Sequence, residues 1–367
     1  MQARLFIHAI NVHQGGGRTL LDGILKLSPA QSTIALLDER MPLPEGISSS
    51  ILIVRVKPSV AGRLQSERLL ASEVNAGDTV LCFGNLPPLF TVPGRVVVFV
   101  QNRYLIEEVS LDRLSIKSRM RLRLERKWFL GRARSVDEYV VQTPSMKTVL
   151  ETYLEKVKTK SGFRIRMLPF MSSDVQVVTG SERGAAVHPL AYDFVYVGSG
   201  ESHKNHRRLI EAWILLAKDG HYPSLSLTID ATGFPALCNW IELQTRRYNL
   251  RVDNRGALPY SGIKDLYNCS TALIYPSTLE SFGLPLIEAK NAGLAILAGE
   301  LDYVRDVADP DQTFDPTSAV SIARAVKRFQ RIEEQSLTII DASTFVDSLI
   351  QTRASHPVPI NEINSFL

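Results

Sequence analysis

Short apolar runs rich in β-branched residues alternate with segments of helical length along most of the chain. Such runs are typical of strands buried on both faces of a parallel sheet. Segments 205–220 and 234–249 have the period of amphipathic helices. Because strand–helix alternation builds parallel sheets with helices on both faces, the pattern predicts an α/β fold with two sheets. We expect the strands of the first sheet at 4–12, 32–38, 50–56, 79–84, 95–100 and 138–143, and those of the second at 193–198, 224–230, 250–256, 271–276 and 294–299.

The two sets of strands are separated by a polar, glycine-containing segment at 169–193. We therefore predict an N-terminal Rossmann-like domain at 1–172 and a C-terminal Rossmann-like domain at 173–340. Helices are expected at 317–335 and 342–352, and residues 341–367 are expected to form a C-terminal helix and tail that packs back on the N-terminal domain. Open α/β sheets bind ligands at the carboxyl ends of their strands, so two facing domains predict a cleft.

Composition limits the kind of protein. The chain has 367 residues and a formal net charge of +4, which does not require a nucleic-acid partner. Its cysteines are odd in number and lie in apolar sequence, which predicts free thiols in a reducing compartment and no metal site. The N-terminus does not resemble a signal peptide, and no apolar run approaches the roughly 18 residues that span a bilayer. We expect a cytoplasmic protein. The cysteines are Cys82, Cys238 and Cys269.

The stretch TLESFGLPLIEAKNAG, at 278–293, carries two acids eight residues apart. One helix would rotate through about 800° over that distance and would not align them. Pro285 suits a first helical turn and Gly293 suits a helix end, so we expect a loop followed by a short helix. Glu280 would follow a strand, and Glu288 would lie in the opening turn. Two acids at one crevice favour a ligand with hydroxyl groups, although Glu288 there could simply complement the helix dipole.

Two other motifs indicate phosphate binding. Gly15, Gly16 and Gly17 follow the first strand and precede a helix that Thr19 could cap, and glycines there let backbone N–H groups approach an anion. The alternative is an ordinary tight turn. Lys204 precedes a helix starting near residue 205, and its ammonium group could bind a phosphate oxygen; the alternative is a solvated surface lysine. His13 adjoins the glycines and is a candidate substrate contact.

Residues 113–134 are strongly basic and contain a single acid, Glu125. Apolar residues recur there every fourth position, as on one stripe of a helix. A basic amphipathic helix suits an anionic membrane surface. The alternative is an ordinary helix whose stripe packs on the first sheet. The stripe is Ile116, Met120, Leu124 and Trp128, and the residues expected to face the membrane are Arg119, Arg123, Arg126 and Lys127.

The order of these motifs, ending in YPSTLESFGLPLIEAKNAG, resembles the retaining glycosyltransferases of family 4, which have the GT-B fold of two facing Rossmann-like domains. The resemblance is strongest from Val197 to Val307. It implies that Glu280 and Glu288 form the E-x7-E motif, with the first acid on the transferred sugar and the second on the ribose. It also implies that Lys204 binds phosphate. The donor-binding residues so implied are Gly15, Gly16, Gly17, Ser199, Lys204, Ser281, Phe282, Gly283, Leu284 and Glu288.

Two positions depart from the family pattern. Many relatives carry an arginine where this chain has Ser199, and Arg207 or Arg208 could replace it. Many also carry a histidine at the end of the strand at 95–100, where this chain has Gln101 and Asn102. Neither is a general base near neutral pH, so we expect them to position the acceptor. Phe282 is also a candidate for core packing.

The resemblance implies a metal-independent enzyme that transfers a hexose, with Glu280 and Lys204 as its catalytic residues. The donor would be a nucleotide sugar, with UDP expected on family frequency. The acceptor would be a lipid-linked glycan of the O-antigen or capsule type, reached at the inner face of the plasma membrane. We expect no cofactor. Two alternatives remain open, a sugar-nucleotide epimerase of GT-B fold and a degenerate sugar-binding relative.

Overall fold

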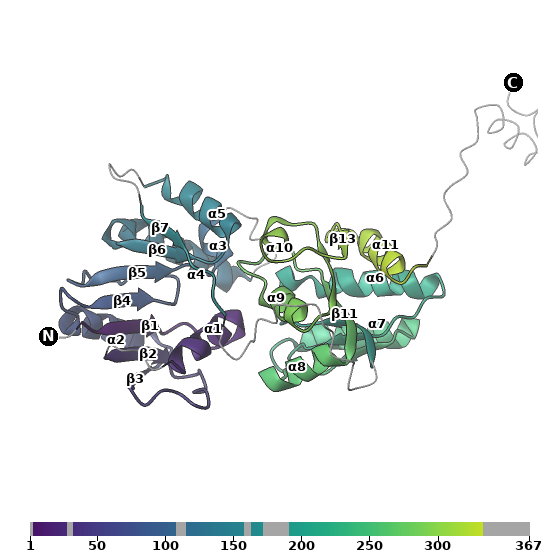
Figure 1. Cartoon of the computed structure of the whole chain (residues 1–367), viewed down its shortest axis with the longest axis horizontal. Coiled ribbons are helices and arrows are strands. Elements are labelled where there is room, and N and C mark those ends of the chain that lie inside the picture. The colour runs from purple at the N-terminus through teal and green to yellow at the C-terminus, as the bar shows by residue number, and fades with distance from the viewer. Residues whose placement is uncertain (1–2, 28–31, 108–114, 158–162, 172–190, 333–367) are drawn as a thin grey trace, which may run out of the picture. The chain divides into compact units, whose positions relative to one another are not determined.

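The computed structural model describes residues 3–27, 32–107, 115–157, 163–171 and 191–332. Residues 1–329 form one compact unit, and every element below belongs to it. The predicted domain boundary, the predicted helix at 342–352 and the tail at 341–367 lie outside the described residues. Figure 1 shows the two α/β lobes that contain these elements. The predicted α/β fold class, with two parallel sheets, is confirmed.

The first sheet has seven parallel strands in the order β3-β2-β1-β4-β5-β6-β7. Its core lies on both faces: one cluster packs around Phe129 and Tyr139, and the other packs around Leu21 and Phe83. The strands are β1 (Leu5–Ala9), β2 (Thr33–Asp38), β3 (Ile51–Val56), β4 (Thr79–Cys82), β5 (Arg95–Phe99), β6 (Glu138–Val141) and β7 (Ile165–Met167). The helices are α1 (Gly15–Leu25), α2 (Val60–Glu73), α3 (Arg103–Ile106), α4 (Ile116–Arg132) and α5 (Pro144–Leu154), with a 3-10 turn at Ala133–Ser135.

The second sheet has six parallel strands in the order β10-β9-β8-β11-β12-β13. Its core is built around Trp213, whose indole N–H donates to the Pro223 carbonyl at 2.9 Å. The strands are β8 (Tyr192–Tyr196), β9 (Leu225–Leu227), β10 (Val252–Asn254), β11 (Ser270–Tyr275), β12 (Ala295–Gly299) and β13 (Gln312–Phe314). The helices are α6 (His206–Lys218), α7 (Pro235–Tyr248), α8 (Tyr260–Asn268), α9 (Leu284–Asn291), α10 (Asp302–Val307) and α11 (Ala319–Phe329), with a 3-10 turn at Ser202–Lys204.

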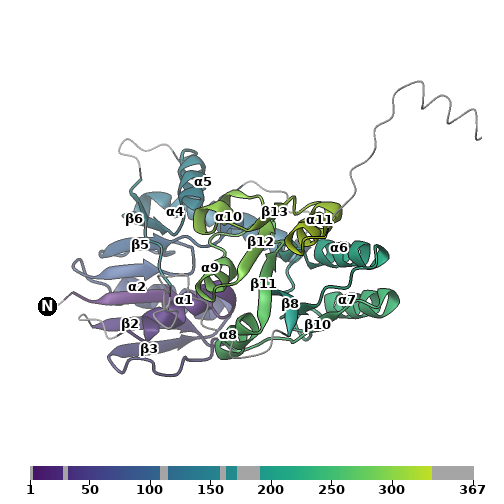
Figure 2. The same cartoon turned by 45° about the vertical axis from the view of Figure 1, so that its right-hand side comes forward.

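In both sheets the strand order reverses at the first strand of the set. β1 lies between β2 and β4, and β8 lies between β9 and β11. Helices α6, α7 and α11 pack together, whereas α8 and α9 pack on β11. Figures 1 and 2 show α6 and α7 beside each other and apart from α8 and α9. Loops after β8 and β11 therefore leave the same edge of the sheet and lead to helices on opposite faces.

The sequence reading missed β7 and β13. Each has three residues and lies at the edge of its sheet, so neither is long enough to give a clear apolar run. The start of α1 was also placed wrongly. The helix begins at Gly15, with Gln14 at the cap position, so Thr19 does not cap it and the three glycines form its first turn. Gly15 has a φ of +70° there, a backbone conformation that favours glycine.

Helix α4 turns its apolar stripe outward. Ile116, Met120 and Leu124 are 77%, 60% and 66% exposed, while Leu122 and Phe129 on the opposite side are buried. The alternative in which the whole stripe packs on the first sheet is therefore wrong for these three residues. Trp128, the fourth member, does pack against the core, beneath the guanidinium of Arg63 at 4.6 Å.

The cations of α4 divide between its two sides. Lys117, Arg121, Arg123 and Lys127 are exposed around the apolar stripe, and Arg119 is half-buried. Arg126, predicted to face a membrane, instead donates to the Tyr104 carbonyl at 2.7 and 3.1 Å and also to the Glu107 carbonyl. Within the described residues no helix combines the length and hydropathy needed to cross a bilayer.

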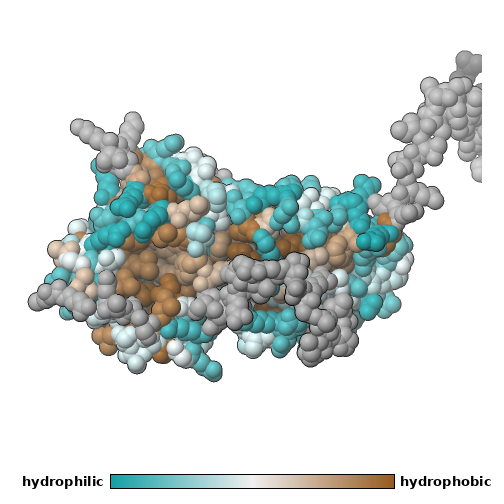
Figure 3. Space-filling model, viewed as in Figure 1, coloured by the Kyte–Doolittle hydropathy of each residue, from teal (hydrophilic) through white to brown (hydrophobic). Residues whose placement is uncertain are grey.

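Apolar side chains are not spread evenly over the surface. On the face seen in Figure 3 they gather over the strands of the first sheet, at the left of the view.

The predicted cysteine state is confirmed, since Cys82, Cys238 and Cys269 are free thiols.

The turn before α9 allows a test of whether its backbone conformation requires glycine. Gly283 has a φ of +73°, and an added Cβ would lie 3.0 Å from Leu286 Cδ1. We predict that Gly283→Ala lowers the free energy of unfolding by about 1–2 kcal/mol, because alanine is strained in this conformation. Urea unfolding measures the change. Gly131→Ala, in α4 with open space around it, is the control and should be neutral or stabilising. Equal effects of the two substitutions would contradict the prediction.

Candidate functional site

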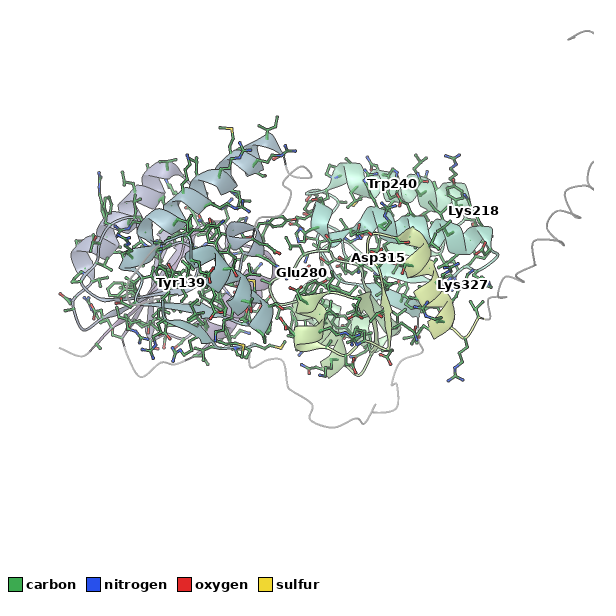
Figure 4. The ribbon with its side chains drawn as sticks, turned by 90° about the horizontal axis from the view of Figure 1, so that it is seen from above. Tyr139, Lys218, Trp240, Glu280, Asp315 and Lys327 are labelled. Atoms are coloured by element: carbon green, nitrogen blue, oxygen red, sulfur yellow. The ribbon has the colours of Figure 1, made fainter. Side chains whose placement is uncertain are left out.

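The candidate site lies where the strand order of the second sheet reverses. Lys204 ends the 3-10 turn that follows β8, and Glu280 lies in the loop between β11 and α9. Because β8 and β11 are neighbours, their loops meet at one edge of the sheet. The Lys204 ammonium nitrogen is 2.6 Å from Oε1 of Glu280. In Figure 4 Glu280 lies at the end of its lobe that is next to the first lobe.

Glu280 is held by three donors. Its Oε1 accepts hydrogen bonds from Lys204, from the Ser277 hydroxyl at 2.6 Å and from the Tyr275 hydroxyl at 3.0 Å. The side chain is only 13% exposed. Burial acts to raise the pKa of Glu280, but the charge of Lys204 and the hydrogen bonds outweigh it and lower that pKa below its usual value. Glu280 is therefore a fixed, ionised carboxylate at neutral pH.

The loop that carries Lys204 is tied to the loop that carries Glu280. The His203 carbonyl accepts from the Thr278 backbone N–H at 2.8 Å and from the Thr278 hydroxyl at 3.2 Å. Asn205 adopts a left-handed conformation, and its amide donates to the carbonyls of Pro276 and Pro316 at 3.1 and 2.7 Å. These bonds fix the positions of the two loops before any ligand binds.

The turn between Glu280 and α9 has backbone N–H groups that lack a partner among the described residues. Helix α9 begins at Leu284 with Pro285 in its first turn, as predicted, and ends before Gly293. Among the described residues, the N–H groups of 281–284 have no acceptor. Together with the start of α9 they form an electropositive edge beside Glu280.

Glu288 is not in the opening turn of α9, contrary to the prediction. Proline occupies that turn, and Glu288 is the fifth residue of the helix. Its carboxylate accepts from the Tyr267 hydroxyl at 3.1 Å, and burial raises its pKa. No hydrogen bond joins it to Glu280 or Lys204 within the described residues. That both acids contact one ligand stays a prediction.

Phe282 and Leu284 face the first lobe. Both side chains are buried in the cluster around Leu21 and Phe83, so Phe282 packs in a core. A Cβ on Gly16 would lie 3.0 Å from Leu284 Cδ1, which places the glycine turn of α1 against the start of α9. Any contact that Phe282 or Leu284 makes with a donor would therefore use its backbone.

Gln101 and Asn102 lie next to that glycine turn. A Cβ on Gly17 would be 3.3 Å from the Gln101 side-chain oxygen. Asn85, which the sequence reading missed, accepts from the backbone N–H groups of both Gln101 and Asn102. Asn85 has a φ of +69°, a conformation that asparagine tolerates. The only sequence signal was an asparagine shortly after a predicted strand.

His13 is partly buried, and Ser199 has a local partner. Burial lowers the pKa of His13, whose Nδ1 has no hydrogen-bond partner among the described residues. The Ser199 hydroxyl donates to the Glu201 carboxylate. Neither residue contacts Glu280 or Lys204 within the described part of the chain.

Arg207 and Arg208, considered as replacements for an arginine at position 199, do not lie against Glu280. The Arg207 guanidinium sits over the Trp240 ring at 4.5 Å, and Arg208 pairs with Glu211 at 2.6 Å. Both partners belong to the α6–α7 side of the sheet. The structure thus gives Lys204 as the cation that touches Glu280.

An ion pair that sequence reasoning missed links the two lobes. Arg103, on α3, donates to both carboxylate oxygens of Asp302, on α10, at 3.0 and 2.7 Å, and it also pairs with Glu107. Arg103 is 9% exposed and Asp302 is 48% exposed. Tyr303, next to Asp302, donates to the Ser277 carbonyl at 2.8 Å. The inter-lobe pair is thereby connected to the residue that holds Glu280.

We predict that a double-mutant cycle on Arg103→Gln and Asp302→Asn gives a coupling free energy of about 1–2 kcal/mol. A two-pronged pair whose arginine is buried loses less to solvent than a fully exposed pair. Urea unfolding of the four proteins measures it. The control cycle uses Arg305→Gln and Asp309→Asn, an exposed pair that should give about 0.5 kcal/mol or less. A coupling no larger than the control's would contradict the prediction.

The described residues contain no group of three or more His, Cys, Asp or Glu that could hold a metal ion. What they do hold at the switch point of a Rossmann-like sheet is a lysine, an ionised acid and a turn of free N–H groups, facing a second such lobe. This fold and this arrangement define the GT-B class. The model of the family "Glycosyl transferases group 1" matches residues 189–344 of this chain.

Two curated relatives from Escherichia coli match part of the chain. O-antigen chain mannosyltransferase B is 27% identical over 145 residues, which are 39% of this chain and 37% of that protein. The serotype-specific mannosyltransferase WbdA is 27% identical over 148 residues, 40% of this chain and 18% of that protein. The match thus spans well under two thirds of either relative.

A solved structure matches nearly the whole chain. HepE from Anabaena, in complex with UDP, has a TM-score of 0.59 over 97% of this chain and 100% of HepE. The sequences are 14% identical, so the likeness shows the fold. The predicted GT-B architecture is confirmed on this basis and on the two parallel sheets.

Proposed function

We propose that the protein is a retaining glycosyltransferase that moves a hexose from a nucleotide-sugar donor to a glycan acceptor. The observation that carries the proposal is the Lys204–Glu280 pair, 2.6 Å apart at the switch point of the second sheet. The match of residues 189–344 to the model of glycosyl transferases group 1 supports it. Transferase chemistry needs a site for a diphosphate and a site for sugar hydroxyls. In this pair the ammonium group suits the diphosphate, and the carboxylate suits the hydroxyls.

The donor would lie along the edge of the second sheet. The Lys204 ammonium has three N–H donors and uses one on Glu280, so two remain for phosphate oxygens. The N–H groups of 281–284 and the glycine turn of Gly15, Gly16 and Gly17 would bind the diphosphate from either side. Glu280 would accept hydrogen bonds from hydroxyls of the transferred sugar. Glu288 is proposed to bind the ribose.

The chemical step needs stabilisation of a leaving diphosphate. Lys204 and the free N–H groups are already oriented, so they stabilise the developing charge without reorganising. We propose displacement on the same face of the sugar, with retention at the anomeric carbon. The leaving phosphate oxygen takes the proton of the acceptor hydroxyl, because neither Gln101 nor Asn102 is a base at neutral pH. We propose that no metal or cofactor takes part.

The donor nucleotide is proposed to be UDP. HepE was solved with UDP, and the two curated relatives are named as mannosyltransferases, one of them an O-antigen chain enzyme. We therefore propose a hexose donor and a glycan acceptor of the O-antigen or capsule type, carried on a lipid. His13, Gln101 and Asn102 would line the acceptor side, since Gln101 lies beside Gly17.

We predict that Glu280→Gln lowers kcat by roughly 10²–10³-fold and changes the Kd for UDP by less than about threefold. The carboxylate acts on the sugar, whereas the nucleotide is bound elsewhere. Lys204→Met should mainly affect nucleotide binding, with UDP affinity falling by at least about tenfold. Release of nucleoside diphosphate from a panel of UDP- and GDP-sugars measures turnover, and calorimetry measures affinity.

The matched control is Glu300→Gln, a surface acid paired with Arg305, which should leave both quantities unchanged. Absence of any nucleotide-sugar turnover and of any thermal shift with millimolar UDP or GDP would contradict the proposal. Conversion of the donor without an acceptor would indicate an epimerase instead. Nucleotide binding without turnover would indicate a degenerate relative.

We further propose that α4 attaches the protein to the cytoplasmic face of an anionic membrane. Its outward face carries three exposed apolar side chains surrounded by Lys117, Arg121, Arg123 and Lys127. Insertion of the apolar stripe places these cations at the headgroups, where each contributes about 1 kcal/mol. A lipid-linked acceptor would then be within reach of the enzyme.

We predict that Arg121→Glu combined with Arg123→Glu lowers binding to phosphatidylserine vesicles by at least about 30-fold, because two attractive charges become repulsive. Co-sedimentation measures the bound fraction. Arg246→Glu with Arg247→Glu, on α7, is the control and should bind like the unaltered protein. Unchanged binding of the α4 variant, or equal binding to neutral vesicles, would refute membrane attachment through α4.

A further inference from the structure

Three buried tyrosine rings pack together next to the Lys204–Glu280 pair. Tyr275, the last residue of β11, is fully buried, and its ring meets those of Tyr196 and Tyr303 edge to face, with centroids 5.6 and 6.4 Å apart. Edge-to-face contact is one of the arrangements that aromatic pairs prefer. The Tyr275 ring is held between the other two, so its hydroxyl has a fixed position.

The hydroxyl of Tyr275 donates to the carboxylate of the site. It lies 3.0 Å from Oε1 of Glu280. Burial, together with the charge of Glu280, raises the pKa of Tyr275 well above its usual value, so the hydroxyl keeps its hydrogen at neutral pH. Its neighbour Tyr196 donates to the Lys204 carbonyl at 2.7 Å instead. The tyrosine cluster thus supports both members of the ion pair.

The hydrogen bonds that the described residues make to the Glu280 carboxylate fall on one of its two oxygens. Lys204, Ser277 and Tyr275 all contact Oε1. No hydrogen bond from the same residues reaches Oε2, and Oε2 is not one of their fully buried polar atoms without a partner. Oε2 is therefore open to solvent. A carboxylate oxygen has two lone pairs, so Oε2 can accept from two hydroxyls of a ligand.

The second acid is arranged in the same way. Tyr267, on α8, is 2% exposed and donates to Oε2 of Glu288 at 3.1 Å. Within the described part of the chain, Oε1 of Glu288 accepts no hydrogen bond and is not a fully buried unpaired atom. Burial raises the pKa of Tyr267 well above its usual value, so this hydroxyl is also a donor. Each acid thus has one oxygen on a buried tyrosine and one oxygen left for a ligand.

We propose that Tyr275 and Tyr267 are positioning residues for the two acids, and that each acid contacts the donor with its other oxygen. Tyr275 directs Oε2 of Glu280 to the transferred sugar, and Tyr267 directs Oε1 of Glu288 to the ribose. The inference rests on the proposed function, because it assigns roles relative to that donor. In this arrangement neither tyrosine touches the donor, and each acts through the carboxylate that it holds.

A carboxylate needs such a donor because the last torsion of a glutamate side chain has a broad preference. Lys204 also contacts Oε1 of Glu280, but its ammonium is a point charge on a flexible stem. A tyrosine has only two side-chain torsions, and a packed ring fixes the direction in which its hydroxyl points. Loss of the Tyr275 hydroxyl should therefore loosen the carboxylate and leave the fold in place.

The test compares conservative variants. Tyr275→Phe should lower kcat at least about fivefold and change the UDP Kd by less than about twofold, because the loosened carboxylate acts on the sugar. Ser277→Ala removes another donor from the same oxygen of Glu280 and should show the same split. Tyr267→Phe should instead weaken UDP binding at least about threefold and leave kcat at saturating donor within about twofold. Release of nucleoside diphosphate measures kcat, and calorimetry measures the Kd.

A double variant shows whether Tyr275 acts through its acid. In Glu280→Ala, which has no carboxylate to hold, the further change Tyr275→Phe should alter kcat by less than about twofold. Tyr139→Phe is the control, since it removes a buried hydroxyl that donates to the Ala133 carbonyl at 3.4 Å in the core of the first lobe. It should leave kcat and the UDP Kd unchanged. Unfolding temperatures show that each variant is folded.

Three results would overturn the role of Tyr275: an unchanged kcat in Tyr275→Phe, an equal loss of kcat in Tyr139→Phe, or an undiminished further loss when Tyr275→Phe is added to Glu280→Ala. Unchanged UDP affinity in Tyr267→Phe would overturn the role of Tyr267. Failure of the transferase proposal is recognised separately, because the unaltered protein would then show no turnover with any nucleotide sugar. That result would overturn both positioning roles as well.

Discussion

The contact between Lys204 and Glu280 depends on one topological fact, that β8 pairs with β11 although 73 residues of strands and helices separate them in sequence order. At 2.6 Å in a medium of effective dielectric near 20, two unit charges attract by roughly 6 kcal/mol. Both side chains are largely withdrawn from water, and loss of hydration offsets much of that attraction. The pair therefore contributes more to orientation than to stability. Its value lies in presenting an ionised acid and an ammonium group in fixed positions.

That fixed position is shared with the contact between the lobes. Arg103 binds Asp302, Tyr303 donates to the Ser277 carbonyl, and the Ser277 hydroxyl donates to Glu280. The packing of Leu284 against Gly16 adds an apolar contact between the same two lobes. A change in the Arg103–Asp302 pair thus reaches the Glu280 carboxylate through two hydrogen bonds. The contact between the lobes and the orientation of Glu280 are linked by these bonds.

Local patterns revealed much of this arrangement. The apolar runs gave most of the strands, and Pro285 and Gly293 gave the limits of α9. What local patterns could not give depends on distance or on side-chain direction. Arg103 and Asp302 are 199 residues apart, so no spacing rule relates them. Arg126 belongs to a basic helix by sequence, yet only the backbone of Tyr104 shows that it points inward. The missed β7 and β13 are stabilised by their neighbours in the sheet more than by their own three residues.

A parallel sheet with helices on both faces places the starts of all its helices at one edge, so positive potential is available on either side of that edge. In this lobe the two sides are filled differently. On the α9 side, a glycine turn with free N–H groups lies beside an acid that is already paired. On the α6–α7 side, Phe234 packs on Gly200 and an arginine lies unpaired over Trp240 among the described residues. The same topology thus presents different groups beside the two sets of helix starts, and side chains rather than the fold set that difference.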